Sequence, residues 1–342
     1  YNVNSEDIVL PTKDQMYLED ADFGGWYDNA LYEGDPITVI AKGSTGNKVL
    51  YAKWTPSEIK TFQLAEQDAA AIAKYNPTYF VNPAFTAIGY KINGVQYLLG
   101  ENLFVTLDEA MAAIKANEAG DVTIYVFAGE YTITTKGTDS ADKYFQLADS
   151  TKTLKIVGPN YDKFGYADNR VAEAKLNMIG GTYGRGNLEF IGVTIAGVSA
   201  TGAVKVGSNY FGNASTSAEQ AWGLTFKNCY LYNFKSMIIF NDKTYSNGFT
   251  FDGCKVASIG QFILWTYAAT KVDSVKIVNN YFDGAKCGGT ANTAGALIRV
   301  RSSSNVEVYN NVFTEIGNAK VPGWFEFSGT TGTFICKYNT FS

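Results

Sequence analysis

The second half of the chain repeats a short pattern of alternating apolar and variable positions that ends on turn residues. Each copy reads apolar, any, apolar, any, then usually Asn or Gly, and then usually Asn or Cys. The copies are Leu224–Cys229, Phe249–Cys254, Val275–Asn280, Val306–Asn311 and Phe334–Asn339, with a degenerate copy at Leu188–Val193. Alternation with a period of two is typical of a β-strand with one buried face. Strands that return every ~25 to 36 residues predict a solenoid, because each rung buries its apolar face only against its neighbours.

Further strands extend this series in both directions. Two earlier apolar segments, 122–126 and 154–158, bring the number of rungs to about eight. Most rungs contain a second apolar segment, at 203–206, 237–240, 262–265, 297–301 and 324–327. Two or three short strands per rung, separated by Gly, Asn and Ser, favour a coil of parallel sheets over a sandwich of antiparallel hairpins. The sequence therefore predicts a mainly β protein with a right-handed parallel β-helix.

The turn residues that close the first strand of each rung form a second regular series. If the rungs superpose, the last residues of the repeat lie above one another at the strand spacing of ~4.8 Å. These residues are Val193, Cys229, Cys254, Asn280, Asn311 and Asn339. The three asparagines can then form a ladder of amides and accept the left-handed backbone of a sharp corner. Such a ladder resembles the one in the pectate-lyase-like family of parallel β-helices.

The first 54 residues have a different character. Three elements occur in order, Ile8–Thr12, Phe23–Asp28 and Val49–Trp54. They resemble the B-repeat of internalin-type bacterial surface proteins, which carries an LPT segment, a GWY core and a closing LYAKW strand. Independently of the family, the aromatic residues Trp26, Tyr27, Tyr51 and Trp54 would anchor a small β-rich module. The resemblance implies a stalk on an extracellular, cell-surface or wall-attached protein.

These observations divide the chain into three parts. We expect a B-repeat module at 1–54, truncated at its N-terminus, a linker and helical cap region at 55–120, and the β-helix at 121–342, truncated at its C-terminus. Helices are predicted over 58–74, with Ser57 as N-cap, and over 107–117. The second has an apolar face of Leu107, Ala110, Met111 and Ile114, suited to covering the open first rung. The order of segments around this helix resembles the opening of many surface β-helix proteins.

Composition excludes several classes of function. The net charge is −5 and no polybasic block occurs, so we expect no nucleic-acid partner. No run of about 18 apolar residues is present, so we expect no membrane span. Histidine is absent, which excludes Ser-His-Asp, Cys-His and His-zinc chemistry. Cys229 and Cys254 fall on adjacent rungs, and either free thiols or a bridge would fit. We expect a monomer.

The candidate binding site lies on the outward positions of the second strand of each rung. The period-two reading gives one column with Lys205, Ile239, Ile263, Arg299 and Glu326, and a next column with Gly207, Asn241, Trp265, Arg301 and Ser328. It predicts Trp265 and Arg301 as neighbours in cation–π contact, with Arg299 and Glu326 beside them. Together with Tyr267 and Asn241, these residues suit a sugar, whose apolar face stacks on an indole while charged groups bind its hydroxyls or carboxylates.

An alternative interpretation gives these residues no ligand. Trp265, Tyr267 and Trp324 would pack beneath the loop 284–295, and the arginines would pair with Glu326 and Glu307. Both interpretations remain open from sequence.

Catalysis finds little support in the chain. Lyases of the pectate-lyase-like family use calcium held by acidic residues and an Arg or Lys base. The outward column of the first strands, however, contains one carboxylate among Lys227, Asp252, Val278, Tyr309 and Lys337. The loop 158–173 is interpreted as a turn-rich excursion tied down by Arg170 and Glu173, rather than as a calcium loop. We therefore expect no catalytic residue, metal or cofactor.

The predicted function is a non-catalytic bacterial surface or secreted protein, adhesin-like, that presents one side of a β-helix to a polysaccharide or glycoconjugate, or to a host surface. One alternative is a secreted polysaccharide lyase or hydrolase of the pectate-lyase-like class. The other is a purely structural spacer.

Overall fold

A computed structural model of the chain describes residues 4–117, 120–133, 144–149, 151–179, 181–183, 186–198, 210–212, 223–234, 236–240, 244–245, 247–266, 271–285, 287, 296–316 and 323–342. The chain divides into two compact units. The first comprises Tyr1–Gln63 and Thr86–Leu99, and the second comprises Leu64–Phe85 and Gly100–Ser342. The segment 86–99 belongs to the first unit because β5 (Ile59–Thr61) pairs with β7 (Gly89–Ile92), which forms a hairpin with β8 (Val95–Leu98).

The rest of the first unit is built from two antiparallel strand pairs. β1 (Ile8–Val9) pairs with β3 (Val39–Ile40), and β2 (Ala21–Tyr27) pairs with β4 (Tyr51–Pro56) through a bulge at Phe23–Gly25. The ring of Phe23 lies 5.5 Å from Trp26 and 5.2 Å from Trp54, between ring centroids. The indole of Trp26 donates to the backbone oxygen of Pro11 at 2.9 Å. Three of the four predicted anchors thus pack here, whereas Tyr51 is exposed.

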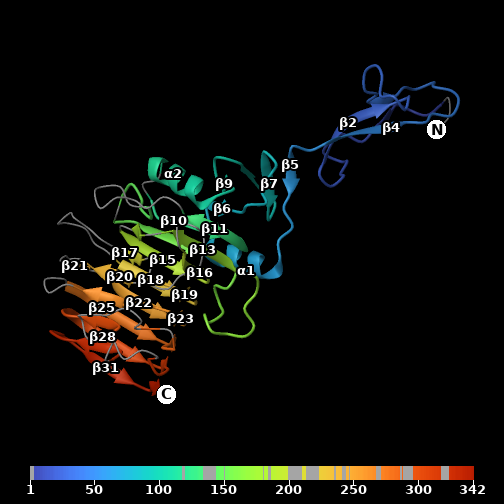
Figure 1. Cartoon of the computed structure of the whole chain (residues 1–342). Helices are drawn as coiled ribbons and strands as arrows, with labels where there is room; N and C mark the ends of the chain where they lie inside the picture. Colours follow the sequence, from blue (N-terminus) through green and yellow to red (C-terminus); the bar gives the residue numbers. More distant parts are fainter. Residues whose placement is uncertain are drawn as a thin grey trace. The chain divides into compact units, whose positions relative to one another are not determined.

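The described residues of the second unit form three parallel sheets, which together make a parallel β-helix, as predicted (Figure 1). Sheet 1 contains, in spatial order, β9 (Leu103–Phe104), β6 (Tyr79–Val81), β10 (Val122–Val126), β12 (Thr153–Val157), β15 (Asn187–Ile191), β18 (Gly223–Lys227), β22 (Gly248–Asp252), β25 (Lys271–Val278), β28 (Ser303–Tyr309) and β31 (Phe334–Lys337). The short strand β21 (Thr244–Tyr245) also pairs with β25.

Two further sheets complete each rung. Sheet 2 contains β11 (Gly129–Ile133), β13 (Ala174–Ile179), β16 (Thr194–Val198), β19 (Tyr230–Tyr232), β23 (Lys255–Ala257), β26 (Tyr281–Asp283), β29 (Val312–Phe313) and β32 (Thr340–Phe341). Sheet 3 contains β14 (Gly181–Tyr183), β17 (Tyr210–Gly212), β20 (Ser236–Phe240), β24 (Phe262–Thr266), β27 (Ile298–Val300) and β30 (Phe325–Phe327).

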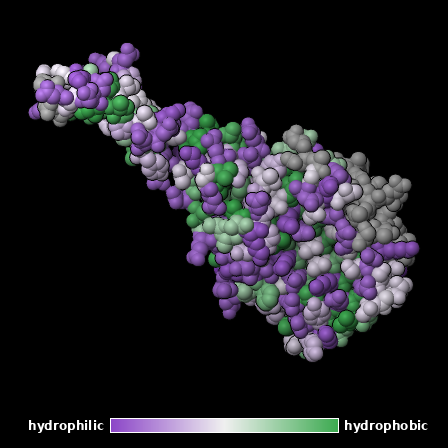
Figure 2. Space-filling view, turned by 180° about the vertical axis from the view of Figure 1, so that it is seen from behind, coloured by the Kyte–Doolittle hydropathy of each residue, from purple (hydrophilic) through white to green (hydrophobic). Residues whose placement is uncertain are grey.

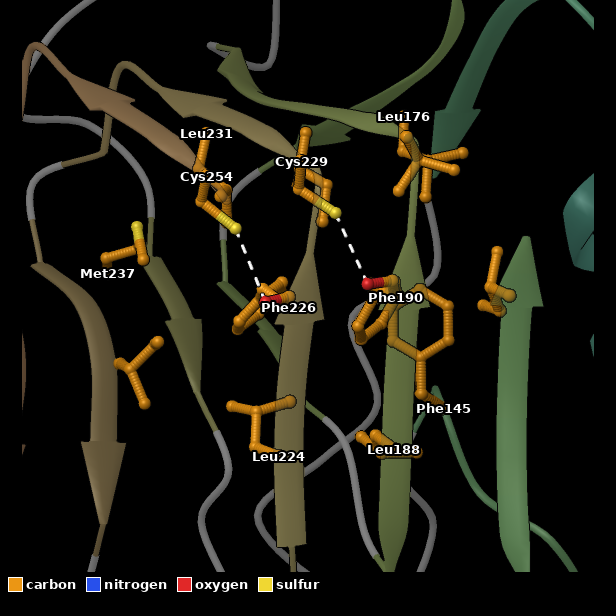
Figure 3. Close-up of a cluster of buried hydrophobic side chains, with 14 of the residues drawn as sticks. Phe145, Leu176, Leu188, Phe190, Leu224, Phe226, Cys229, Leu231, Met237 and Cys254 are labelled. Carbon is orange, nitrogen blue, oxygen red and sulfur yellow. Dashed lines mark hydrogen bonds between the residues drawn. The ribbon is translucent and has the colours of Figure 1, made fainter. Parts of the chain in front are cut away.

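The core of the β-helix is a stack of inward side chains from sheet 1. The register pairs Phe190, Phe226, Phe251, Ile277 and Val308 in succession, so the second apolar position of each repeat points inward, as its period of two predicts. The rings of Phe190 and Phe226 are stacked at 5.3 Å, and those of Phe226 and Phe251 at 5.4 Å. Figure 3 shows Phe145 against Phe190, where the two rings meet edge to face at 5.1 Å.

Two columns, rather than one, build the corner between sheets 1 and 2. The left-handed backbone falls on the residue before the ladder, at Gly192, Asn228, Gly253, Asn279, Asn310 and Tyr338, with φ between 55° and 67°. The ladder itself follows as predicted. Asn280 Nδ2 donates to Asn311 Oδ1 at 2.9 Å, and Asn311 Nδ2 donates to Asn339 Oδ1 at the same distance. The expectation that the ladder asparagines themselves adopt the left-handed conformation was wrong by one residue.

Two helices accompany the β-helix. α2 (Leu107–Asn117) matches its prediction: it buries Leu107, Ala110, Met111 and Ile114 at the first rungs. Its start is a capping box, because Glu109 N donates to Thr106 Oγ1 and Thr106 N donates to the Glu109 carboxylate. α1 (Glu66–Tyr75) is shorter than the predicted helix over 58–74, and Ser57 is not its cap. Residues 59–61 form β5 instead, because strand pairing with β7 overrides their local preference.

The loop 158–173 is tied to the corner between sheets 1 and 2. Its Gly165 amide donates to Gly253 O at 2.7 Å, and Arg170 Nη1 donates to Asn228 O at 3.0 Å. Arg170 and Glu173 form the expected ion pair at 3.0 Å. Gly165 is required there, since an added Cβ would collide with the backbone of Cys229.

No helix among the described residues is long and apolar enough to cross a membrane. On the face seen in Figure 2, hydrophilic residues are interspersed with smaller hydrophobic areas.

Candidate functional site

Three of the predicted site residues, Trp265, Arg299 and Glu326, lie on three adjacent strands of sheet 3, in a register that differs from the predicted one. The strand pairing places Trp265 of β24 opposite Arg299 of β27, and Arg299 opposite Glu326 of β30. The prediction paired Trp265 with Arg301, which lies two residues beyond its true partner and just after the end of β27. The reason is that Phe262, Ile263 and Leu264 are all buried, so the apolar run before Trp265 shows no alternation from which to fix the register.

Arg299 is buried between its two neighbours. Its guanidinium carbon lies 4.3 Å from the centre of the Trp265 ring, and its Nε lies 3.3 Å from Glu326 Oε1. Only 5% of Arg299 is exposed, so its predicted place on an open strip was wrong. Its Nε makes no hydrogen bond to the described residues, which makes the contact with Glu326 an ion pair without hydrogen-bond alignment. Trp265 is half-buried, and one face of its indole is occupied by this cation.

The solvent-accessible charged side chains of the site are those of Arg301 and Glu326. Their side chains are 41% and 38% exposed, and Arg301 Nε lies 3.9 Å from Glu326 Oε1. The backbone of Arg301 is held in place, since its amide donates to Thr266 Oγ1 at 2.9 Å. A pair this exposed contributes little to stability, because water screens the attraction. Both groups therefore retain most of their capacity to bind a polar ligand.

Directly after Arg301 the chain enters a hollow of about 440 Å³ between β25, β28 and the segment before β31. The hollow is lined by Lys271, Val272, Asp273, Ser302, Ser303, Ser304 and Thr331. Ser304 Oγ donates to Asp273 Oδ1 at 3.0 Å, and the hydroxyls of Ser303 and Thr330 lie 3.3 Å apart. Hydroxyls, a carboxylate and an ammonium group offer both donors and acceptors to a ligand rich in hydroxyls.

The sequence reasoning missed this hollow. The run of three serines after Arg301 was the available signal, but turn residues are rich in serine for purely structural reasons.

The other residues named in the two interpretations of the site are only partly described by the structure. Tyr267 and Asn241 lie outside the described residues, as does most of the loop 284–295. Trp324 packs on the core, with its ring 5.3 Å from that of Phe313. The alternative expectation, that the loop 284–295 covers it, falls largely outside the described residues. The arginines contact Glu326, whereas Glu307 lies in sheet 1 opposite Lys276.

The first-strand column offers no metal site. The register aligns its five residues as predicted, and Asp252 is their one carboxylate, but Val278 among them is buried rather than exposed. Asp252 Oδ1 already accepts from Asn279 Nδ2 at 2.9 Å. In the part of the chain that the structure describes, no group of three or more His, Cys, Asp or Glu side chains could hold a metal ion.

The question left open at Cys229 and Cys254 is settled in favour of free thiols. Each thiol donates to the backbone oxygen of the preceding rung, Cys229 to Phe190 and Cys254 to Phe226, both at 3.3 Å (Figure 3). The ladder asparagines donate to the same positions of their preceding rungs, so the cysteines continue the column as weaker donors. Burial raises the pKa of Cys254 well above its ordinary value, which keeps this thiol protonated and unreactive.

Comparisons with known proteins give one structural likeness. No family model matches the chain, and no curated protein is significantly similar to it. Among solved structures, the chain is similar to "Structure of PL6 family alginate lyase AlyGC", with a TM-score of 0.38 and 16% sequence identity. The match covers 69% of this chain and 38% of that chain, so this chain spans well under half of the enzyme's length.

Proposed function

We propose that this protein is a non-catalytic, adhesin-like protein of the bacterial cell surface or exterior, and that the sheet 3 site binds a glycan. The site comprises Trp265, Arg301 and Glu326 together with the hollow that follows Arg301. One observation carries the proposal: two partly exposed charged groups of opposite sign lie 3.9 Å apart, and the chain runs from Arg301 directly into the lining of a hollow that contains several hydroxyls. Such a set of fixed polar groups next to an aromatic edge is suited to sugar hydroxyls and carboxylates.

The surface location rests on residues 1–54. Their LPT, GWY and LYAKW elements support a B-repeat stalk outside the cell, and the asparagine ladder supports a β-helix of the pectate-lyase-like kind. In this proposal the first unit spaces the β-helix from its anchor, and the β-helix provides the binding side.

The geometry assigns different roles to the site residues. Arg301 and Glu326 would contact the glycan directly, since each presents more than a third of its side chain to solvent. Trp265 would contribute an edge rather than a full ring face, because Arg299 covers one face. Arg299 would act as a positioning residue that fixes the indole and the carboxylate of Glu326.

Binding to a glycan array tests the proposal, followed by titration of the best-bound oligosaccharide. Arg301→Ala is expected to weaken binding by about 1 kcal/mol, roughly fivefold, with an unchanged melting temperature. Trp265→Ala is expected to weaken binding by roughly 1 to 3 kcal/mol. It should also lower the melting temperature, because the buried Arg299 loses its aromatic partner.

Lys337→Ala is the matched control, since it removes an exposed cation from the outer face of sheet 1. Equal losses of affinity in Lys337→Ala and Arg301→Ala would show that only the net charge of the protein matters, and would overturn the assignment of Arg301 to the binding site. So would full affinity in Arg301→Ala.

A further inference from the structure

A second set of aromatic and charged side chains lies on the outer face of sheet 2. The strand register aligns Lys175, Thr194, Tyr230, Lys255 and Tyr281 in one row. Two residues further along the same strands, it aligns Asn177, Ala196, Tyr232, Ala257 and Asp283 in a parallel row. Both rows point away from the core, because the residues between them, such as Leu231 and Phe282, are fully buried.

The rings of this surface are arranged around lysine. Tyr230 and Tyr232 are stacked with centroids 4.6 Å apart. The Nζ of Lys255 lies 5.1 Å from the ring centre of Tyr230 and 5.9 Å from that of Tyr281, one rung away on the other side. All three tyrosines are half-buried, so each ring still presents part of its surface to solvent. We call Lys175, Asn177, Tyr230, Tyr232, Lys255 and Tyr281 the tyrosine face.

One edge of the tyrosine face contains a polar cluster with an unused acceptor. Glu130 Oε1 lies 3.2 Å from Lys175 Nζ, and Glu130 Oε2 accepts from Asn177 Nδ2 at 3.2 Å. This contact fixes the orientation of the Asn177 amide, since only its nitrogen can donate to a carboxylate. Asn177 is 8% exposed, and no donor among the described residues reaches its Oδ1.

A buried acceptor without a donor is costly and calls for a ligand or an ordered water. A sugar hydroxyl provides such a donor. It can also accept from the ammonium group of Lys175 beside the amide.

We propose that the tyrosine face is a second binding surface, which takes a neutral saccharide. Half-exposed phenol rings can stack on the apolar faces of sugar rings, and the Glu130–Lys175–Asn177 cluster can bind their hydroxyls. This surface belongs to sheet 2, and its assignment does not depend on the sheet 3 site.

The charges of the surface favour an uncharged sugar over an acidic one. Lys175 is already neutralised by Glu130, and Lys255 shares the face with Asp283. The same charges argue against a protein partner, because the centres of protein interfaces are depleted in Lys, Glu and Asp. Here these residues are interleaved with the rings.

Affinity electrophoresis tests this proposal without knowledge of the natural ligand. Native gels are run with and without soluble xyloglucan, galactomannan, mixed-linkage β-glucan or starch. The wild-type protein is expected to be retarded by at least one of these neutral polysaccharides. Tyr232→Ala is expected to raise the dissociation constant for that polysaccharide roughly tenfold, the scale of losing one stacked aromatic contact.

Tyr17→Ala is the matched control and is expected to keep the wild-type retardation, because Tyr17 is an exposed tyrosine of the first unit, outside both proposed binding sites. Arg301→Ala is run beside it to report on the sheet 3 site. Tyr281→Ala, on a different strand, is run in parallel and keeps the test decisive if Tyr232→Ala does not fold. Absence of retardation by all four polysaccharides would overturn the tyrosine face. Losses in Tyr17→Ala equal to those in Tyr232→Ala and Tyr281→Ala would overturn it too. Loss in Arg301→Ala alone would support the sheet 3 site and refute the second surface.

Discussion

Substitution of Asn311 by alanine perturbs the corner ladder at its centre. Asn311 Nδ2 donates to Ile277 O at 2.8 Å and to Asn339 Oδ1 at 2.9 Å. Asn311 Oδ1 accepts from the backbone amide of Asn280 at 3.0 Å and from its Nδ2 at 2.9 Å. Four hydrogen bonds are lost at a residue that is 1% exposed; the partners on Ile277 and Asn280 stay buried, whereas Asn339 is partly exposed. At about 0.5–1.5 kcal/mol each, the free energy of unfolding should fall by about 2–6 kcal/mol.

Urea unfolding, followed by tryptophan fluorescence and by far-ultraviolet circular dichroism, measures this loss. Asn311→Cys is the matched control, because the chain itself places Cys229 and Cys254 at this position of earlier rungs. A thiol keeps one donor to the preceding rung, as Cys254 does toward Phe226 at 3.3 Å. Asn311→Cys is therefore expected to be less destabilised than Asn311→Ala. A loss below about 1 kcal/mol in Asn311→Ala would show that the ladder does not stabilise the corner.

Two other predictions concern buried titratable groups. In the native protein a thiol reagent should label one of the four cysteines, the exposed Cys336. In guanidinium chloride it should label all four. Rapid labelling of two or more cysteines in the native protein would contradict the burial of the other three. Burial raises the pKa of Asp68 above its ordinary 3.8, although the Tyr125 hydroxyl donates to it at 2.6 Å. The folded state thus favours protonated Asp68. The resulting contribution to the free energy of unfolding is complete below pH 3.8 and is lost as the pH rises through the raised pKa. Thermal melts at stepwise lower pH should therefore show the wild type gaining stability relative to Asp68→Asn, and a constant difference would contradict the reasoning.

The sequence predicted sheet 1 and its corner well because both carry strong local signals. Five residues of strict alternation fix which side chains point inward, and the turn residue after each strand fixes the register. Val306–Asn311 shows both signals within six residues. The pairing of Ile277 with Val308 followed directly from them.

Sheet 3 was predicted less accurately, and the sheet 2 surface was not predicted. The apolar run Phe262–Trp265 has no alternation, so its register depends on packing that no local pattern encodes. The burial of Arg299 likewise follows from neighbours on two other strands. The strands β19 and β26 have three residues each, too few to display a period of two. Their outward tyrosines therefore gave no distinguishable signal.

We propose that the β-helix binds glycan without acting on it. The most direct measurement incubates the wild-type protein with a panel of acidic and neutral polysaccharides, and records bound protein, unsaturated sugar products and new reducing ends in the same samples. We expect binding to at least one polysaccharide, weakened in Arg301→Ala, and no product above the level of a protein-free control. Accumulation of either product would contradict it in favour of a lyase or hydrolase, and absence of binding throughout the panel would leave a structural spacer.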